Sequence, residues 1–357
     1  MLRIGIIGPQ GCGKTTLLQA LAPAVKVDGG TRREIHIGQA KVQDARLDHL
    51  YHIFGRSKKV NAIVEYVDVA GYQRGEAKTS GYDPQLLVEI RSCDALLHLL
   101  RGFDTPGLPD ADPLAGYETD FAEFLISDQI IVEHRIERLE KEISKKPSPD
   151  LKREYQIMQR CQAALLEEQP LRTLDFSAEE EKILRAFQLL SLKPELVVIN
   201  IAEEDIARSK DIVSEFRQTI QHPGVEVSVA CATIEMEIAQ LDEASAREFM
   251  DDLGIRESAL NRLIRASYKL LGLISFFTIG DDECRAWTIR NGAIARAAAG
   301  EVHSDIERGF IRAEVVHFDD FKPRGDLAAC RKDGVRRLEG KQYIVKDGDI
   351  IEFRFAV

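Results

Sequence analysis

The sequence predicts an α/β protein built on a mostly parallel sheet, with an inserted α-helical hairpin and a small, separate C-terminal domain. Three observations support this fold class. Short apolar runs alternate with amphipathic segments, a highly charged stretch with helical periodicity interrupts them, and short strands with Gly-Asp turns follow from about residue 274. A chain of 357 residues is too long for one typical hydrophobic core, so two or three domains are expected.

The composition is that of an ordinary globular protein, with 44% hydrophobic and 30% charged residues. The formal net charge of −11 argues against a DNA-coating protein, and no sequence-specific DNA partner is expected. No long apolar run is present, so no membrane partner is expected either. The six cysteines are scattered without zinc-site spacing, and the N-terminus begins with a strand pattern instead of a signal segment. These features predict a cytoplasmic protein with reduced thiols.

The first element is an apolar strand at residues 2–7, and a Gly-rich loop follows it directly. Residues 8–15 read GPQGCGKT, which fits the pattern GxxxxGKT, and a helix is expected from Thr16 to about Ala22. In this strand–loop–helix context the pattern predicts a P-loop and disfavours an ordinary Gly-rich turn. Backbone N–H groups of such a loop surround a phosphate, and the helix N-terminus adds partial positive charge. We therefore expect the chain to bind a nucleoside triphosphate.

The residues of this loop have separate expected roles. Lys14 is expected to reach the β- and γ-phosphates, and the hydroxyl of Thr15 is expected to ligate Mg²⁺. The other nucleotide-binding residues predicted in this segment are Gly8, Gln10, Gly11, Cys12, Gly13 and Thr16. Oxidation of Cys12 would block such a site, but a small residue that simply fits the loop is the favoured interpretation.

The segments after the P-loop predict the rest of the sheet domain and the hairpin. Strands are expected at residues 35–42, 62–69, 95–100, 196–200 and 225–229, and helices at 84–92 and within 233–271. Apolar runs that alternate with helices imply a parallel sheet covered on both faces. Between residues 117 and 190, apolar positions at helical spacing flank a break that contains two prolines, which predicts an antiparallel hairpin. The alternative is that these helices belong to the main helical layer.

The last part of the chain predicts a separate mixed α/β domain. Its strands are expected at residues 274–279, 284–289, 309–316, 342–346 and 349–355. The domain boundaries that follow are 1–116 with 191–273 for the nucleotide-binding domain, 117–190 for the hairpin, and 274–357 for the C-terminal domain.

A DxxG sequence, Asp68 to Gly71, stands at the end of the strand expected at 62–69. After a P-loop, this arrangement predicts the second half of a nucleotide switch. Asp68 would hold Mg²⁺ through a water, and the N–H of Gly71 would bind the γ-phosphate. The next residue is Tyr72, where switch GTPases use a glutamine to position the attacking water. Gln73 is adjacent, but a shift of one residue points its side chain elsewhere. His98 is a second candidate, although a histidine on an apolar strand is more often a satisfied core residue.

The residues expected to select the base follow the strand at 196–200. Guanine-specific switches use NKxD, whose aspartate accepts two hydrogen bonds from guanine, whereas this chain has Asn200, Ile201, Ala202 and Glu203. The lysine is absent, and the loss of the bidentate contact is worth roughly 2–4 kcal/mol. We expect adenine to be read by Asn200 and the backbone of Ile201, so ATP is favoured over GTP.

Together these parts resemble the Obg-like ATPase family, in the YchF branch of the P-loop translation-factor-class GTPases. The resemblance rests on the P-loop, the DVAG and NxxE sequences, the inserted hairpin, and C-terminal stretches such as CRAWTIR at 284–290 and GFIRAEV at 309–315. It spans nearly the whole chain. The family fold implies a G-domain-like P-loop NTPase with an inserted hairpin and a C-terminal TGS domain of β-grasp fold.

The resemblance also implies a Mg²⁺-dependent ATPase that associates with the ribosome or ribosomal RNA through the hairpin and the TGS domain. It assigns Ala230, Cys231 and Ala232 to the loop that backs the base, Thr31 to a Mg²⁺-ligating switch position, and a hydrolytic role to His98. Gly11 departs from the family pattern, because related NTPases carry an asparagine there that is tied to potassium activation. Potassium dependence is therefore left open.

Four functions remain as alternatives. The first is slow hydrolysis of ATP, with Lys14, Asp68, Gly71 and His98 as the catalytic residues and nucleotide state coupled to a ribosomal partner. A GTPase of the same architecture is the second, against which Glu203 argues. The third is an adaptor that binds ATP and barely hydrolyses it, and a small-molecule kinase is the least favoured.

Overall fold

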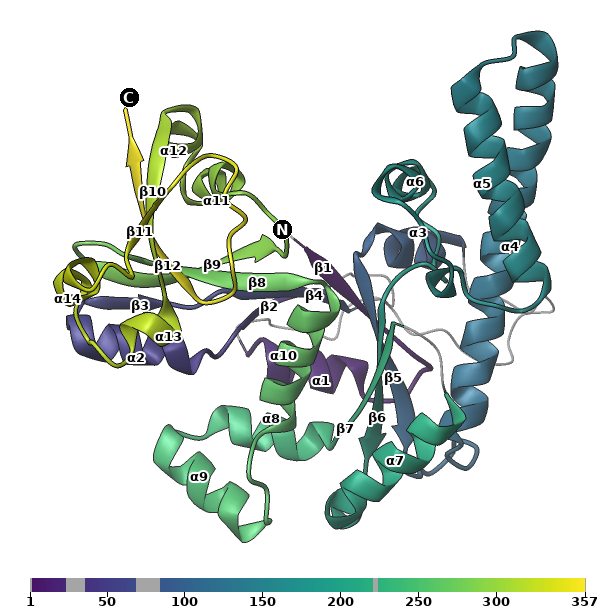
Figure 1. Cartoon of the computed structure of the whole chain (residues 1–357). Coiled ribbons are helices and arrows are strands. Elements are labelled where there is room, and N and C mark those ends of the chain that lie inside the picture. The colour runs from purple at the N-terminus through teal and green to yellow at the C-terminus, as the bar shows by residue number, and fades with distance from the viewer. Residues whose placement is uncertain (1, 24–35, 69–83, 221–223, 357) are drawn as a thin grey trace. The chain divides into compact units, whose positions relative to one another are not determined.

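The computed structural model describes residues 2–23, 36–68, 84–220 and 224–356 (Figure 1). Its first sheet has six strands in the order β2-β4-β1-β5-β6-β7. These strands are β1 (Arg3–Ile7), β2 (His36–Lys41), β4 (Ile63–Asp68), β5 (Ala95–Gly102), β6 (Glu195–Ile201) and β7 (Val225–Ala230). The pairs from β4 through β1, β5 and β6 to β7 are all parallel, which confirms the predicted α/β fold class.

The helices of this part follow the strands as the alternating pattern predicts. They are α1 (Lys14–Leu21), α3 (Pro84–Ser92), α7 (Ser209–Thr219), α8 (Ala232–Gln240), α9 (Glu243–Asp252) and α10 (Ala259–Leu270). Short helical turns lie at η1 (Leu171–Thr173), η2 (Arg185–Phe187) and η3 (Glu203–Arg208), and α6 spans Ala178–Leu184. Ile90 of α3 packs with Ile7, Val67 and Leu96 of three neighbouring strands. Burial of these apolar side chains fixes the strand ends that carry the site.

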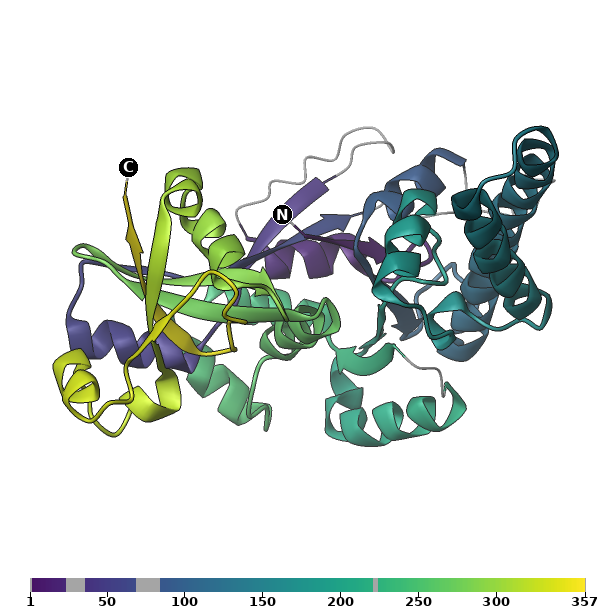
Figure 2. The ribbon, with the colours of Figure 1, turned by 45° about the horizontal axis from the view of Figure 1, so that its top comes forward.

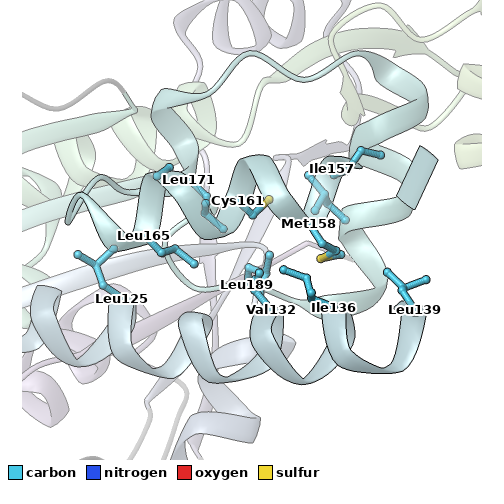
Figure 3. Close-up of a cluster of buried hydrophobic side chains, with 12 residues drawn as sticks. Leu125, Val132, Ile136, Leu139, Ile157, Met158, Cys161, Leu165, Leu171 and Leu189 are labelled. Atoms are coloured by element: carbon cyan, nitrogen blue, oxygen red, sulfur yellow. The ribbon is translucent and has the colours of Figure 1, made fainter. Parts of the chain in front are cut away.

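The hairpin consists of α4 (Pro113–Lys145) and α5 (Pro149–Leu166), which lie side by side along α5 (Figure 2). A side-chain cap begins each helix. The side chain of Asp112 accepts the N–H of Ala115 at the start of α4, and that of Ser148 accepts the N–H of Leu151 at the start of α5. The two helices bury one apolar cluster between them and the following segment (Figure 3). Its members include Leu125, Val132, Ile136, Leu139, Ile157, Met158, Cys161, Leu165, Leu171 and Leu189.

The second sheet has the strand order β11-β10-β12-β8-β9-β3. Its strands are β3 (Lys58–Val60), β8 (Leu273–Ile279), β9 (Glu283–Arg290), β10 (Phe310–His317), β11 (Arg337–Glu339) and β12 (Asp349–Phe355). β8 and β9 are antiparallel, β12 runs parallel to β8, and β10 is antiparallel to β12. With α11 (Ala295–Val302) packed on it, this topology is the predicted β-grasp fold. The remaining short helices are α12 (Ser304–Arg308), α13 (Phe318–Phe321) and α14 (Leu327–Lys332).

One C-terminal prediction is wrong. Residues 342–346 form no strand, and only Ile344 makes an isolated bridge, to Ile294. The side chain of Asp349 accepts the N–H of Lys346 at 2.9 Å, so a turn forms here instead of a paired strand. The apolar residues of this segment suggest a strand in the sequence. In the structure, Val345 is buried in the core of the second sheet without belonging to a strand.

The chain divides into two compact units, residues 1–39 with 65–263, and residues 40–64 with 264–357. The predicted boundaries differ from this division. Residues 40–64 were assigned to the nucleotide-binding domain, but α2 (Ala45–Phe54) and β3 belong to the C-terminal unit, where β3 pairs with β9 and Phe54 stacks on Phe321. The hairpin is not a separate unit, because α4 begins at Pro113 and runs without a break through the predicted boundary at 117.

All six cysteines lie in the described part of the chain as buried, free thiols. Within those residues, no helix has both the length and the apolar character needed to cross a membrane.

Candidate nucleotide-binding site

The P-loop connects the carboxyl end of β1 to the N-terminus of α1, as the sequence predicts. Gly13 caps the helix with a left-handed backbone (φ 95°, ψ 20°), and Gly8 also has a positive φ of 143°. A Cβ added at Gly8 would collide with the carbonyl oxygen of Leu99 on β5, so only glycine fits this close approach. The loop is thus held against the neighbouring strand in the conformation that a phosphate cradle requires.

Lys14 points into this loop. Its Nζ donates to the carbonyl oxygens of Gly8 (2.8 Å) and Pro9 (2.9 Å), and the residue is buried. The ammonium group is therefore held where the loop folds around a phosphate, as predicted. Burial raises the pKa of the neighbouring Cys12 thiol, which keeps the sulfur protonated and weakly reactive. This supports the interpretation of Cys12 as a small residue that fits the loop.

Thr15 and Asp68 meet at the start of α1. The Thr15 hydroxyl donates to Oδ2 of Asp68 at 3.1 Å. Oδ1 of Asp68 is buried and accepts no hydrogen bond from the residues that the structure describes. Burial raises the pKa of Asp68, although Lys14 and Thr15 act to lower it. The charges and hydrogen bonds of the neighbouring residues therefore do not fully offset the cost of burying this carboxylate. A hydroxyl and an unsatisfied carboxylate oxygen are the hard ligands that Mg²⁺ prefers, and these residues therefore fit the predicted ion.

Asn200 lies at the end of β6 and links two loops. Its Nδ2 donates to the carbonyl oxygen of Cys12 at 2.8 Å, and its Oδ1 accepts the N–H of Ala232 at 2.9 Å. A Cβ on Gly13 would collide with this amide. Asn200 thereby fixes the P-loop to the N-terminus of α8. That its amide also reads adenine stays a prediction, because each end of the amide can form a second hydrogen bond.

The other predicted base-site residues surround this link. Ala230 pairs with Asn200 across β6 and β7, and Cys231 and Ala232 are buried at the start of α8. Ile201 is buried at the end of β6, whereas Glu203 is exposed at the start of η3. The structure thus gathers 200–203 and 230–232 at the same edge of the sheet as the P-loop. Among these residues, Glu203 is exposed, Ala202 is partly exposed, and the others are buried.

His98 is fully buried, contrary to a water-orienting role. Its Nδ1 lies 2.9 Å from Glu195 Oε1, and its Nε2 lies 2.8 Å from Asp120 Oδ2 on α4. Glu195 also accepts a hydrogen bond from Arg172 at 2.9 Å. Both ring nitrogens are therefore bonded to buried carboxylates, and the side chain has no exposed surface. The structure favours the alternative that His98 is a satisfied core residue, which joins β5 to α4.

His98 has a predictable effect on stability. Burial disfavours its charged form, but hydrogen bonds with Asp120 and Glu195 outweigh burial and raise the pKa of His98 to about 9. Since this folded-state pKa lies above the ordinary value of 6.5, the stabilisation is complete below about pH 6.5 and is lost as pH rises through 9. At about 1.4 kcal/mol per pKa unit, the contribution is on the order of 3 kcal/mol.

We therefore expect the melting temperature of the wild type to fall between pH 7 and pH 10. In the His98→Gln variant, which cannot gain the charge, this fall should be smaller, and calorimetry across the same pH series measures the difference. Equal pH slopes for the two proteins would show that folding does not raise the pKa of His98.

Four predicted positions lie outside the described residues. Thr31, Gly71, Tyr72 and Gln73 are in the segments 24–35 and 69–83, so their roles remain predictions. Sequence reasoning also overlooked a loop that the structure places beside Gly11. This loop follows β5. Arg101 of β5 forms a hydrogen bond with its first residue, Phe103, and Leu108 lies against Gly11. The sequence indicates this loop only through its position after a predicted strand of the parallel sheet, where ligand-binding loops commonly lie.

Two family models match this chain. A family model described as "50S ribosome-binding GTPase" matches residues 3–201, and the YchF GTPase C-terminal model, described as "Protein of unknown function (DUF933)", matches residues 273–356. "Ribosome-binding ATPase YchF" of Bacillus subtilis (strain 168) is 38% identical over 365 residues, with 100% of both chains covered. The protein of the same name from Escherichia coli O157:H7 is 36% identical over 99% of both chains.

Two further relatives extend the similarity beyond bacteria. "Obg-like ATPase 1" of Oryza sativa subsp. japonica is 33% identical, with 100% of this chain and 92% of the relative covered. The solved structure of the Schizosaccharomyces pombe YchF GTPase superposes with a TM-score of 0.87 at 29% identity. It covers 99% of this chain and 97% of that one. The match therefore includes both compact units.

Proposed function

Because the chain belongs to the YchF/Obg-like ATPase family, we propose that it binds ATP with Mg²⁺ and hydrolyses it slowly to ADP and phosphate. The observation that carries this proposal is the meeting of Lys14, Thr15 and Asp68 at one end of the parallel sheet. Lys14 neutralises charge on the phosphates, while Thr15 and Asp68 would hold the ion. Mg²⁺, when bound, supplies further charge neutralisation at the transferred phosphoryl group.

The base site supports a preference for ATP over GTP. The aspartate that guanine requires is replaced by Glu203, whose side chain is exposed at the start of η3. The loss of a bidentate contact to a charged acceptor is worth roughly 2–4 kcal/mol, enough to remove a preference for guanine. A GTPase of the same architecture remains the second candidate, because one of the matching family models is described as a GTPase.

We also infer that the nucleotide state controls binding to a ribosome, which would place the protein in the cytoplasm. The relatives named as ribosome-binding ATPases support this partner. The distal end of the hairpin carries exposed lysines among exposed acidic residues. Lys141, Lys145, Lys146 and Lys152 are exposed there, and none of them forms an ion pair with the residues that the structure describes. Unpaired lysines suit contacts with RNA phosphates.

The double variant Lys145→Gln/Lys146→Gln is expected to weaken ribosome binding. Each lost phosphate contact should lower the slope of log affinity against log salt concentration by roughly 1, so the slope falls by about 2. Cosedimentation with purified ribosomes across a salt series measures this slope. The matched control is Lys182→Gln/Lys210→Gln, which removes two exposed lysines elsewhere. If both double variants bind like the wild type, the hairpin end is not the RNA contact.

A further inference from the structure

The loop that follows β5 lies beside the P-loop and is absent from every role assigned so far. In the sheet order, β5 stands between β1, which leads into the P-loop, and β6, whose last two residues are Asn200 and Ile201. Arg101 of β5 pairs in register with Asn200. Since all three strands are parallel, the loops that leave their carboxyl ends lie at one edge of the sheet. The segment 103–111 therefore shares this edge with the phosphate loop and the residues predicted to receive the base.

This loop is held in a defined conformation by the protein itself. The Arg101 guanidinium donates to the carbonyl oxygens of Phe103 (3.1 Å), Pro109 and Asp110 (3.2 Å). The N–H of Ala111 donates to Oδ1 of Asp104 at 2.8 Å, which closes the loop across its base. Charged hydrogen bonds of this kind are stronger than neutral ones. The loop is therefore held by contacts within the protein.

Leu108 at the tip of this loop is fitted to Gly11 of the P-loop. A Cβ added at Gly11 would lie 2.7 Å from Cδ1 of Leu108, and Gly11 has a φ of 80° that side chains rarely adopt. Leu108 thus fills the space that a side chain at position 11 would need. It nevertheless remains 40% exposed, so an apolar surface is left open beside the phosphate loop.

We propose that Leu108 is a positioning residue of the nucleotide site. Its side chain covers the site beside the phosphate loop and retains the bound nucleoside triphosphate. This inference rests on the proposed function. When a nucleotide covers the exposed part of Leu108, apolar surface leaves water and stabilises the complex. Such contacts act mainly on the dissociation rate, because they are broken as the ligand leaves.

The test is nucleotide dissociation from the full-length protein, measured by stopped-flow fluorescence of N-methylanthraniloyl-ATP with Mg²⁺. Leu108→Ala is expected to raise the dissociation rate about tenfold, equivalent to about 1.4 kcal/mol, with little change in the association rate. Leu241→Ala is the matched control, because Leu241 is 41% exposed in the same unit at the far end of α8. That variant should release nucleotide at the wild-type rate.

A double-mutant cycle separates fitted packing from a general loss of hydrophobicity. Gly11→Ala introduces the Cβ that collides with Leu108, so the Gly11→Ala/Leu108→Ala double variant should release nucleotide more slowly than the two single effects predict together. Additive effects, or an unchanged rate in Leu108→Ala, would overturn this inference while leaving the proposed function intact. Failure of the wild type to bind the labelled nucleotide would instead overturn the proposed function.

Discussion

Lys14→Ala is expected to reduce ATP turnover by at least about a hundredfold, the range found when one preorganised donor to a transition state is removed. The Lys14 ammonium lies within the P-loop, bonded to the carbonyl oxygens of Gly8 and Pro9. On binding, it exchanges these oxygens for those of the phosphates and neutralises charge that grows during transfer. Phosphate release at saturating ATP and equilibrium titration of affinity measure the two effects separately.

The control for this variant is Lys210→Ala, which removes an exposed lysine from α7 in the same unit. It should retain wild-type turnover and affinity. Thermal melting of Lys14→Ala checks that loss of the two internal hydrogen bonds has not unfolded the unit. A folded Lys14→Ala protein with unchanged affinity and turnover would contradict the assignment of the P-loop as the nucleotide site.

Asp68→Asn is expected to lower turnover by about a hundredfold at ordinary Mg²⁺ concentrations and to raise the Mg²⁺ concentration needed for half-maximal rate. The substitution keeps an acceptor for the Thr15 hydroxyl but removes the negative charge that attracts the ion. Turnover measured against free Mg²⁺ tests this expectation. Because the Asp68 carboxylate is buried with one unsatisfied oxygen, the nucleotide-free variant should be at least as stable as the wild type.

Asp94→Asn provides a matched control. Asp94 accepts the N–H of Arg3 at the start of β1, which is the opposite end of the sheet from the P-loop. Its loss should leave the Mg²⁺ response unchanged. Identical Mg²⁺ responses for Asp68→Asn and the wild type would show that another group holds the ion.

The elements that the sequence predicted well are those specified by local patterns. The P-loop follows a strand and begins a helix, and the helix predicted at 84–92 matches α3. The assignment of residues 40–64 failed because their partners are distant in sequence. Lys58–Val60 pairs with β9, more than two hundred residues away, and no local pattern encodes such a partner.

The site shows the same division between local and distant information. The apolar run around His98 correctly predicts a buried strand, but the carboxylates that bind its ring come from Asp120 and Glu195, in segments far along the chain. Asn200 was expected to face the base because its sequence context resembles a base-reading motif. Its actual hydrogen bonds, to Cys12 and Ala232, depend on how three loops meet. The sequence therefore predicts the strands and the loops that follow them, but not the long-range hydrogen bonds of His98 and Asn200.

The proposed preference of this P-loop for ATP over GTP can be measured directly. The most direct test is equilibrium titration of the nucleotide-free, full-length protein with fluorescent ATP and GTP analogues, each with Mg²⁺. We expect ATP to bind at least about tenfold more tightly, a difference of about 1.4 kcal/mol. Tighter binding of GTP would mean that Glu203 or a backbone group reads guanine, and it would contradict the proposed ATPase.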